Sequence, residues 1–537
     1  MNRLLRVVPC LAVLTACSPA PAGGGSGAGG SASGGSSAGT GGTTGDSGSG
    51  GATGTGGATG SAGTTGSGGT SGSGGAPGLG GAAGLGGAAG SPAAACAPPT
   101  ILPTPATGGD AVAGTLTQFN DNGAWTWYSD ERAVVDSAGG KLIISSDGNS
   151  LGTGGAARNG QIDAVIYDLA TKTSQRTALG QLSPDDHNNA AVLVRPDGRY
   201  LAMYAGHNQD CRSYYRSYDG TTWGATAMFD WAPLGCSVTA STKVTYSNLW
   251  QMSAENKIYS FVRSIGTSPN LLVSSNNGQT FTYAGRLTST PQVGYVAGYY
   301  KYWGNGVDRI DFVGTEAHPR DFDNSLYHGY FKGGRTYDSR DRMLDADIAD
   351  NTQPDITAFT RLFATGSVIH GVTLTHAWNI DLQRYDDGTI ALLWKARADA
   401  NTDSPDHRLL YARYDGVSWK LTYLGKAGPK LYPDEQDYVG LGALHPNDPR
   451  TIYISTTIDP RDDTTNLVRH EIFQGTTCDN GTTFTWTPVT ARSTRDNLRP
   501  IVPAWDANHT ALLWFRGTYT TAQQYNAAVV GIISTRP

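Results

Sequence analysis

The sequence predicts an all-β protein, a seven-bladed β-propeller, with six or eight blades as the alternatives. Short runs such as KLIISSD, QIDAVIYDL and ALLWFRG alternate apolar and polar residues and are rich in Val, Ile, Tyr and Trp. Turns containing Gly, Asp and Asn separate these runs, and no stretch shows a sustained helical period. Alternation with a period of two, interrupted by frequent turns, is typical of a protein built from many short strands.

A recurring turn indicates the number of blades. The stretch YDGTTW at 218–223 returns as YDGVSW at 414–419, and more loosely as NGQTF at 277–281 and DNGTTF at 479–484. Each is a tight turn followed by an aromatic residue on the next strand. The spacing fits a unit of roughly 60 to 70 residues, with one unit lacking a recognisable turn. Dividing the region 96–537 by this unit gives about seven four-stranded blades.

The N-terminus carries the features of an exported lipoprotein. MNRLLRVVPCLAVLTAC has a basic head, a short apolar stretch and a lipobox that ends at Cys17. We therefore expect residues 1–16 to be a signal peptide and Cys17 to be lipidated, the alternative being an ordinary cleaved signal with a chance cysteine. Because Ser18 follows Cys17, we expect the outer membrane or cell surface of a Gram-negative bacterium. The apolar stretch is too short for a permanent span, so the lipid anchor is the expected membrane contact.

The composition divides the rest of the chain in two. Residues 17–95 are almost wholly Gly, Ser, Thr and Ala, which predicts a lipidated N-terminus followed by a disordered linker. Residues 96–537 contain the strand-like runs and no second linker, so we expect one catalytic propeller, acting as a monomer. The formal net charge of −6 argues against a nucleic-acid partner. Cys211 and Cys236 are the expected disulfide pair of this exported domain, and no CxxC motif indicates a thiolate zinc site.

Two His-Asn pairs mark the candidate site. His187-Asn188 stands before, and His207-Asn208 after, the apolar strand-like segment that contains AAVLVRPDGRYLAMYAG. This segment predicts two antiparallel strands joined by a Pro-Asp-Gly turn, so that its ends return to the same edge of a sheet. Propellers carry their chemistry on loops around the central channel. We therefore expect the two imidazoles to be neighbours at one mouth of the channel, suited to proton transfer or metal binding.

These pairs belong to a wider pattern that resembles a known family. The histidine spacing, followed by TYSNLWQMSAENKIYSFVRS with Tyr246 and Arg263, resembles the active site of propeller-type polysaccharide lyases, the ulvan lyases and rhamnosyl-glucuronate lyases. Other blocks resemble the same BNR-repeat superfamily: WTWYSDERAVV, AHPRDFDNSLYHGYFKGG, THAWNIDLQRYDDGTIALLW and DNLRPIVPAWDANHTALLWFRGTY. The resemblance covers most of 120–535. It implies cleavage of an acidic polysaccharide, with rhamnose-linked glucuronate as the expected substrate, by β-elimination.

The resemblance also implies a role for each of four residues. Elimination must remove the C5 proton of the uronate, stabilise the resulting carbanion or enolate, and protonate the departing O4. His187 and His207 are implied as proton-transfer or carboxylate-contacting residues, Tyr246 as general acid or base and Arg263 as neutraliser of the carboxylate. A guanidinium can bind a carboxylate through two parallel hydrogen bonds, and a phenol beside cations can have its pKa lowered. Which residue is the base and which the acid stays open.

Further polar and aromatic residues are weaker candidates. The expected substrate-binding residues are Asn188, Asn208, Asn248, Arg320, Tyr327, His376 and Trp378. The chemistry needs no cofactor, but His318 and His328 are candidate ligands of a structural zinc or calcium ion. The ordinary alternatives are turn residues for the asparagines, packing under the channel for the Tyr and His residues, and core for His376 and Trp378.

Two other functions remain open. A non-catalytic glycan-binding BNR propeller would keep the aromatic residues and the arginine, but it would have no use for two converging histidines and a tyrosine. A sialidase-like glycoside hydrolase would need paired carboxylates, and sialidases add an arginine triad; the histidine-bearing loops show neither clearly. An elimination enzyme accounts for all four catalytic candidates.

Overall fold

The computed structural model describes residues 109–127, 129–130, 132–239, 243–398, 406–433 and 435–536. All of them belong to the unit Gly87–Pro537. The expected signal peptide, Cys17, the linker and Cys96 lie outside these residues. Across the described ranges, no helix is long and apolar enough to cross a membrane.

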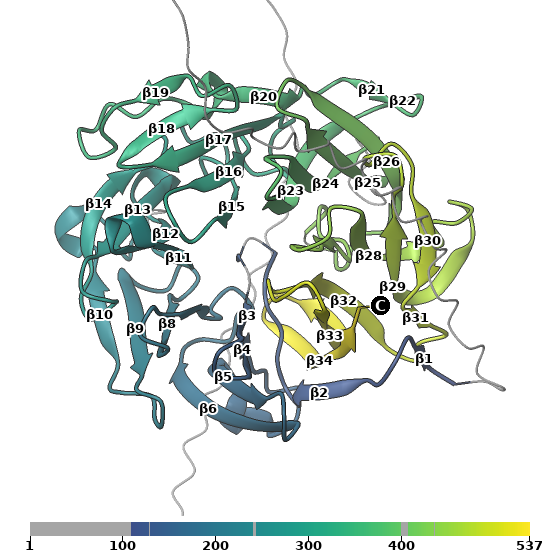
Figure 1. The fold of residues 1–537 in the computed structure, drawn as a ribbon, viewed down its shortest axis with the longest axis horizontal. Coiled ribbons are helices and arrows are strands. Elements are labelled where there is room, and N and C mark those ends of the chain that lie inside the picture. The colour runs from purple at the N-terminus through teal and green to yellow at the C-terminus, as the bar shows by residue number, and fades with distance from the viewer. Residues whose placement is uncertain are drawn as a thin grey trace, which may run out of the picture. The chain divides into compact units, whose positions relative to one another are not determined.

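Seven antiparallel sheets, each of four or more strands, form a ring around a central axis (Figure 1). From the inner to the outer strand, the first three are β3(Ala133–Asp136), β4(Lys141–Asp147), β5(Gln161–Asp168), β6(Thr173–Gln181); β7(Ala191–Val194), β8(Tyr200–Tyr204), β9(Arg212–Tyr218), β10(Ala227–Asp230); β11(Thr245–Met252), β12(Lys257–Arg263), β13(Pro269–Ser274), β14(Thr282–Arg286). The fourth is β15(Tyr300–Gly304), β16(Ile310–Gly314), β17(Leu326–Lys332), β18(Arg335–Asp338), β19(Met343–Asp345), with β20(Thr360–Phe363) paired to β17.

The next two sheets follow the four-stranded pattern. They are β23(Thr375–Arg384), β24(Ile390–Arg397), β25(His407–Tyr414), β26(Trp419–Gly428); and β27(Gly442–Leu444), β28(Thr451–Ile458), β29(Asn466–Thr476), β30(Thr485–Pro488). Two small two-stranded pairs lie outside the seven sheets: β1(Ala111–Val112) with β31(Thr490–Ala491), and the hairpin of β21(Val368–Ile369) with β22(Val372–Thr373).

The seventh sheet joins the two ends of the described chain. Its strands, from inside outward, are β32(Asp496–Ile501), β33(His509–Thr521), β34(Gln524–Thr535) and β2(Thr117–Asn120). Strand β2 pairs with β34 in the register Thr117 to Gly531, so an early strand supplies the outer edge of the last blade. This pairing closes the ring, and the predicted seven-bladed propeller is confirmed.

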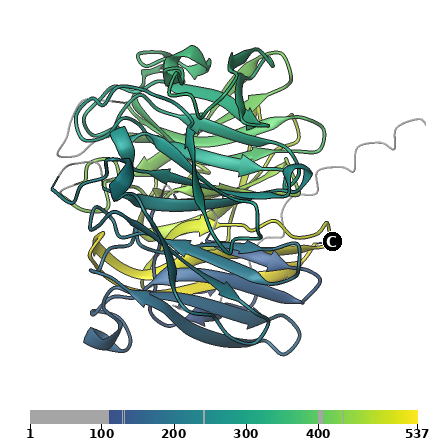
Figure 2. The ribbon, with the colours of Figure 1, turned by 90° about the vertical axis from the view of Figure 1, so that its left-hand side faces the viewer.

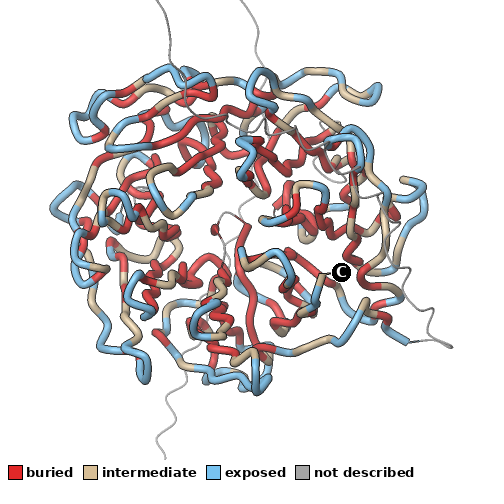
Figure 3. Tube along the Cα trace, in the orientation of Figure 1, coloured by how far each residue is buried: buried red, intermediate tan, exposed pale blue. Residues whose placement is uncertain are grey.

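Apolar side chains between neighbouring blades hold the ring together. Between the second and third blades, for example, Leu201 and Met203 pack with Leu249, Ile258 and Leu272, all buried. The second strand of a blade, such as β8 or β24, is buried along its length because both of its faces meet neighbouring blades, whereas exposed residues gather at the periphery (Figure 3). Figure 2 shows the blades edge-on.

The recurring turns occupy equivalent places. All four join the third strand of a blade to its fourth, in the second, third, fifth and sixth blades. Asp219 Oδ1 accepts hydrogen bonds from the backbone N–H groups of Thr221 and Thr222, and Asp415 Oδ1 does the same for Val417 and Ser418. An acidic residue that caps its own turn in this way fixes the hairpin locally, which is why the motif was visible in the sequence.

The expected disulfide is present in the second blade. Cys211 and Cys236 are bonded, with their Cα atoms 5.8 Å apart. Cys211 precedes β9 and Cys236 follows β10, so the bond ties the chain leaving the blade back to that blade. Both sulfurs lie in the apolar layer between the second and third blades.

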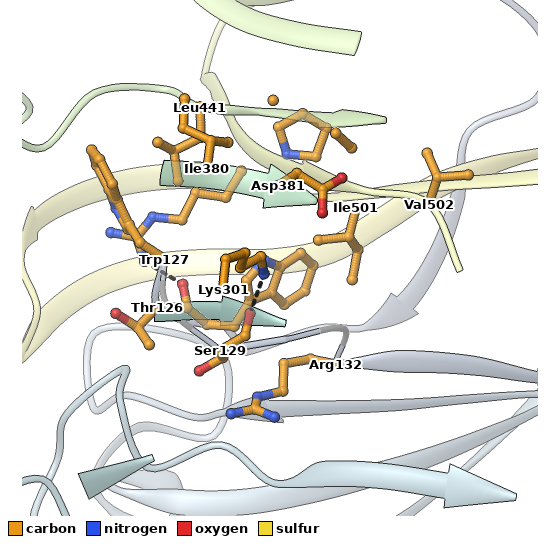
Figure 4. A pocket seen from close by; sticks show the side chains of 15 residues that line it. Thr126, Trp127, Ser129, Arg132, Lys301, Ile380, Asp381, Leu441, Ile501 and Val502 are labelled. Carbon is orange, nitrogen blue, oxygen red and sulfur yellow. Dashed lines mark hydrogen bonds between the residues drawn. The ribbon is translucent and has the colours of Figure 1, made fainter. Parts of the chain in front are cut away.

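The segment between β2 and β3 runs into the centre of the ring of blades (Figure 1). Lys301 on β15 donates a hydrogen bond to the backbone oxygen of Ser129 at 2.8 Å (Figure 4). The N–H of Asp130 donates to Asn248 on β11 at 2.8 Å. Arg132 donates to the side chain of Asn189 at 2.5 Å. These contacts with the innermost parts of the second, third and fourth blades make the segment a plug of the channel.

Candidate active site

The two His-Asn pairs meet beside the first strands of the second blade. Strands β7 and β8 pair in the register Ala191 to Met203, which returns the residues outside them to one edge. The imidazole rings of His187 and His207 stack with centroids 3.9 Å apart and planes 11° apart. The hairpin reasoning therefore placed these two side chains correctly.

Asp185 bridges the two imidazoles. Its Oδ1 lies 2.6 Å from Nδ1 of His187, and its Oδ2 lies 3.0 Å from Nδ1 of His207. Gln523, in the turn between β33 and β34, donates a further hydrogen bond to Oδ2 at 2.5 Å. One carboxylate thus faces both rings and a side chain from the last blade.

The two histidines have different protonation equilibria. Burial opposes charge on His187, but the carboxylates of Asp185 and Asp186 outweigh it and raise the pKa to about 9. Burial lowers the pKa of His207 below its ordinary value of 6.5, and the neighbouring charge of His187 lowers it further against the opposing pull of Asp185. At neutral pH the pair therefore consists of an imidazolium at His187 and a neutral imidazole at His207.

A second carboxylate, that of Asp186, also contacts His187. Asp186 Oδ1 lies 2.8 Å from Nδ1 of His187, and Asp186 Oδ2 accepts hydrogen bonds from Arg499 at 2.8 Å and from the Tyr519 hydroxyl at 2.6 Å. Arg499 also donates to the backbone oxygen of Trp125 in the channel plug. Arg499 pairs with an aspartate between blades, and it adds no free charge to the channel.

Tyr246 and Arg263 lie next to the histidine pair. Thr245 on β11 pairs with Arg263 on β12, and a register shift follows at Tyr246, which has a positive φ of 67°. The Tyr246 ring centroid lies 5.7 Å from that of His187 and 4.9 Å from the guanidinium carbon of Arg263. The structure thus brings all four predicted catalytic residues together.

Burial outweighs the neighbouring cation in the protonation of Tyr246. Burial raises the pKa of Tyr246 well above its ordinary value, and the neighbouring Tyr299 adds to the effect against the opposing charge of Arg263. Burial likewise raises the pKa of Tyr299 to about 12. Desolvation of a buried phenolate outweighs one neighbouring guanidinium. Both phenols carry their protons at neutral pH.

A cavity of about 350 Å³ opens beside these groups. Its lining residues are His187, His207, Tyr295, Tyr299, His318, Arg320, Tyr432, Glu435, Tyr438, Thr521, Ala522 and Gln523. They come from the second, fourth, sixth and seventh blades and from the connections before them. Tyr246 and Arg263 line a smaller hollow of about 20 Å³, which shares Tyr299 with the main cavity.

The three predicted asparagines have different positions. Asn188 Oδ1 accepts a hydrogen bond from the backbone N–H of His207 at 2.7 Å, so it fixes the second histidine. Asn208 has a positive φ of 52° and donates to the Tyr295 hydroxyl at 2.5 Å, at the cavity rim. Asn248 is buried against the channel plug and lies outside the cavity lining.

Arg320 and His318 form the opposite wall with Glu435, a residue the sequence did not single out. Arg320 donates to Glu435 Oε2 at 3.0 Å, and His318 Nε2 lies 4.0 Å from the same oxygen. Burial raises the pKa of Glu435 to about 7, with Arg320 opposing this and Asp437 adding to it. Burial and the charge of Arg320 lower the pKa of His318 well below its ordinary value.

The two candidate metal ligands contact different residues. His328 on β17 is fully buried, with Nε2 3.2 Å from Asp311 and Nδ1 2.7 Å from Ser339. His318 instead contacts the cavity aromatics and Glu435. In the part of the chain that the structure describes, the one group of three side chains able to hold a metal is Asp185, His187 and His207. The structural ion stays a prediction.

The remaining predicted substrate contacts lie outside the cavity lining. The Tyr327 hydroxyl donates to Glu316 at 2.8 Å, and the Tyr327 ring packs between blades. His376 Nδ1 lies 2.8 Å from Asp323. Trp378 is fully buried with its ring centroid 5.0 Å from that of Tyr299, so it supports the cavity wall and offers no surface for stacking a sugar. The exposed aromatic ring at the rim is Tyr295, at 37 % exposure.

Several cavity residues could not be found by sequence reasoning. Asp185 stands two positions before His187, so the sequence around the first His-Asn pair could have indicated it. Glu435 and Tyr438 lie in the connection between β26 and β27, and Gln523 lies in a hairpin turn, where no local pattern distinguishes a functional residue from a loop residue. Their function depends on the closed ring, which brings distant connections to one mouth.

Comparison with known proteins gives a likeness of fold. No family model matches the chain, and no curated protein matches it. An ulvan lyase of polysaccharide lyase family PL25, bound to –[GlcA(1-4)Rha3S]–, has a similar solved structure with 15 % identity and a TM-score of 0.54. A second PL25 ulvan lyase structure has 15 % identity and a TM-score of 0.53. Each alignment covers 78 % of this chain and 97 % of the other. These likenesses show the same propeller fold.

Proposed function

We propose that this protein is a polysaccharide lyase that cleaves a uronic-acid glycan by β-elimination, with rhamnose-linked glucuronate as the preferred substrate. The observation that carries the proposal is the stacked pair of histidines, one charged and one neutral, at a cavity that shares Tyr299 with the adjoining hollow of Tyr246 and Arg263. The similar ulvan lyase structure binds glucuronate linked to rhamnose 3-sulfate, which supports the choice of substrate class.

His207 is the general base in this proposal. Its Nδ1 faces Asp185, which leaves Nε2 with the lone pair, and it lines the cavity with its side chain 17 % exposed. His187 is occupied at both nitrogens, since Nδ1 faces Asp185 and Nε2 lies 3.4 Å from the Tyr438 hydroxyl. A base must be neutral and accessible at working pH, and His207 meets both conditions.

Arg263 neutralises the substrate carboxylate. Its Nη1 donates to the Tyr299 hydroxyl at 3.0 Å, while Nη2 is buried without a hydrogen-bond partner among the described residues. A buried donor without a partner is unfavourable, so a bound carboxylate oxygen would satisfy it. As negative charge develops on the substrate, a fixed guanidinium stabilises it more than water would.

A tyrosine donates the proton to O4. In the elimination, the C5–H bond breaks and its proton goes to Nε2 of His207. The electron pair forms the C4=C5 double bond, the C4–O4 bond breaks, and O4 takes the phenolic proton. Tyr246 is the predicted donor, and its raised pKa keeps that proton in place until the leaving oxygen develops charge. Tyr246 contacts Tyr299, which reaches the cavity wall.

The geometry favours elimination over hydrolysis. Two-carboxylate hydrolysis needs a second acid or nucleophile facing the sugar. Of the described side chains that line the cavity, Glu435 is the one carboxylate. Asp185 is engaged by two imidazoles and Gln523, and Asp186 by Arg499 and Tyr519. A purely glycan-binding propeller would have no need of the unequal histidine pair.

The location and the requirements of the enzyme complete the proposal. We propose an exported monomeric lipoprotein, attached through Cys17 to the outer membrane or cell surface and separated from it by the linker. His207, Arg263 and Tyr246 supply base, charge and acid, so the reaction needs no metal cofactor, and the net charge of −6 fits a partner other than nucleic acid.

The test is an assay of the full-length protein on a panel of glucuronate-containing glycans. The expected result is the appearance of an ultraviolet-absorbing unsaturated uronate product, strongest on rhamnose-linked glucuronate and unchanged by a chelator. New reducing ends without the unsaturated product would instead identify a hydrolase, and binding without any product would identify a glycan-binding protein.

A further inference from the structure

We propose that Asp185 is a positioning residue that joins His187 and His207 into one unit carrying a single positive charge, which lies on His187. The inference deepens the proposed function, because its effect on turnover depends on His207 acting as the base. The assignment of charge within the pair is independent of any activity.

The geometry fixes the direction of both rings. Each carboxylate oxygen of Asp185 faces a different Nδ1, at 2.6 Å and 3.0 Å, and the rings are nearly parallel. Both histidines are therefore held with hydrogen on Nδ1 and with Nε2 turned away from Asp185. For His207, this leaves Nε2 as a hydrogen-bond acceptor at the cavity that His207 lines.

The close stacking prevents both rings from being charged together. Two positive rings with centroids 3.9 Å apart repel strongly in a buried site, and one carboxylate neutralises only one of them. Asp186 lies 2.8 Å from Nδ1 of His187. Arg263 raises the cost of charge on His207. The single positive charge of the pair therefore lies on His187.

The groups around the pair leave this asymmetry intact. Tyr438 and Tyr246 face His187 with protonated phenols, because burial raises both of their pKa values. Gln523 is uncharged, and it completes the hydrogen bonds of Asp185. Arg499 neutralises Asp186 from the side away from the rings. Asp185 is thus the one charged group in direct contact with both imidazoles among the described residues.

Removing the carboxylate charge has a defined consequence. In Asp185→Asn the amide can accept from only one Nδ1–H through its oxygen, so the second ring loses its acceptor. His187 then loses the larger of the two charges that favour its protonation, and His207 is no longer restricted to the tautomer with a free Nε2. A role limited to packing would alter neither quantity, because aspartate and asparagine have nearly the same shape.

The experiment is an NMR titration of the full-length protein with labelled histidines, assigned through single His→Gln variants. In the wild type, one imidazole should titrate near pH 9 and its neighbour below 6.5, both as Nδ1–H tautomers when neutral. Asp185→Asn should bring the higher value down by at least one unit and give mixed tautomers. Its kcat should fall by about 10²- to 10⁴-fold, the usual effect of a positioned acid or base, with KM changed much less.

A matched control and a conservative variant sharpen the result. Asp506→Asn removes a carboxylate 2.9 Å from Nδ1 of His509, at a half-exposed pair away from the cavity, and should leave the His187 and His207 titrations and kcat unchanged. Asp185→Glu keeps the charge and should retain the split titration in part. Equal titration of the two wild-type histidines, or an unchanged split in Asp185→Asn, would overturn the proposal.

The same measurements separate this inference from the proposed function. A wild-type split that collapses in Asp185→Asn, in a protein that forms no unsaturated product, would support the positioning role and reject the lyase. Product formation that survives Asp185→Asn at full rate would reject the positioning role and retain the lyase. If Asp185→Asn does not fold, the wild-type titration and Asp185→Glu still decide the question.

Discussion

Burial decides the protonation of the phenols at this site, and specific carboxylates decide that of the histidines. Tyr246 lies beside a guanidinium, yet desolvation raises its pKa. His187 is as thoroughly buried, but two carboxylates within 2.8 Å more than offset desolvation and hold it charged. The sequence indicated which residue types gather here; the balance between burial and contact depends on neighbours such as Asp186, which only the folded chain brings into place.

The pH dependence of activity follows from the unequal histidines. The base form of His207 is neutral, so kcat/KM should fall as the pH drops through its pKa, which lies below 6.5. The charged form of His187 is lost as the pH rises through about 9, so kcat/KM should fall there too. Steady-state assays across this range should give a plateau around neutrality. A profile still rising above pH 9 would exclude a role for the His187 charge.

The planar guanidinium of Arg263, with two nitrogens that can donate in one plane, gives a second prediction about a single residue. Arg263→Lys keeps a positive charge but cannot offer one nitrogen to Tyr299 and another to a carboxylate in a single plane. We expect kcat/KM to fall by at least about 10-fold, with the larger part in kcat, because the guanidinium acts on charge that develops during the reaction. Wild-type kinetics for Arg263→Lys would mean that the guanidinium does not contact the reacting uronate.

At the scale of single elements, hairpins and turns were predictable because their determinants are local. The segment between His187 and His207 carries its own alternation and turn, and the register of β7 with β8 follows from them. The channel plug is different: the segment around Asp130 has no strand pattern, and its place depends on hydrogen bonds to Asn248 and Lys301 in two other blades. Long-range partners of this kind leave no periodic signal.

The disulfide of the second blade supports a prediction about stability. Cys211 and Cys236 close a loop with a sequence separation of 25. Replacing both with serine should lower the free energy of unfolding by about 2–4 kcal/mol, since the unfolded chain gains freedom. Denaturant unfolding of wild type and double variant measures the difference. A reductant should lower the free energy of unfolding of the wild type more than that of the double variant. Equal stabilities of the two proteins without reductant would show that the bond does not constrain this blade.

Closure of the ring is the property of the whole molecule on which the site depends. The cavity gathers residues from connections far apart in sequence, such as His207, Glu435 and Gln523, and they meet because β2 pairs with β34. The number of blades could be predicted from the repeating turns, but the composition of the cavity could not. A residue in a connection is functional only through its position in the closed ring, and the sequence around Glu435 does not report that position.

Phe119 on β2 offers a test of closure. It is 3 % exposed, and its ring makes an edge contact with Tyr167 of the first blade at 5.0 Å. Phe119→Ala should reduce the free energy of unfolding by about 3–5 kcal/mol through lost burial and the cavity left behind. Val468→Ala, at a position 92 % exposed, is the matched control and should change it by less than about 0.5 kcal/mol. Equal changes in the free energy of unfolding for the two variants would mean that Phe119 does not stabilise the closed ring.

The most direct test of elimination at this site is the rate of unsaturated-product formation from a rhamnose-linked glucuronate glycan by three single variants. Tyr246→Phe removes the phenolic hydroxyl, and His207→Ala removes the base. Each should keep glycan binding and lower turnover by about two to four orders of magnitude. His509→Ala, away from the cavity, should retain wild-type turnover. Near-normal turnover in both Tyr246→Phe and His207→Ala would contradict elimination at this site.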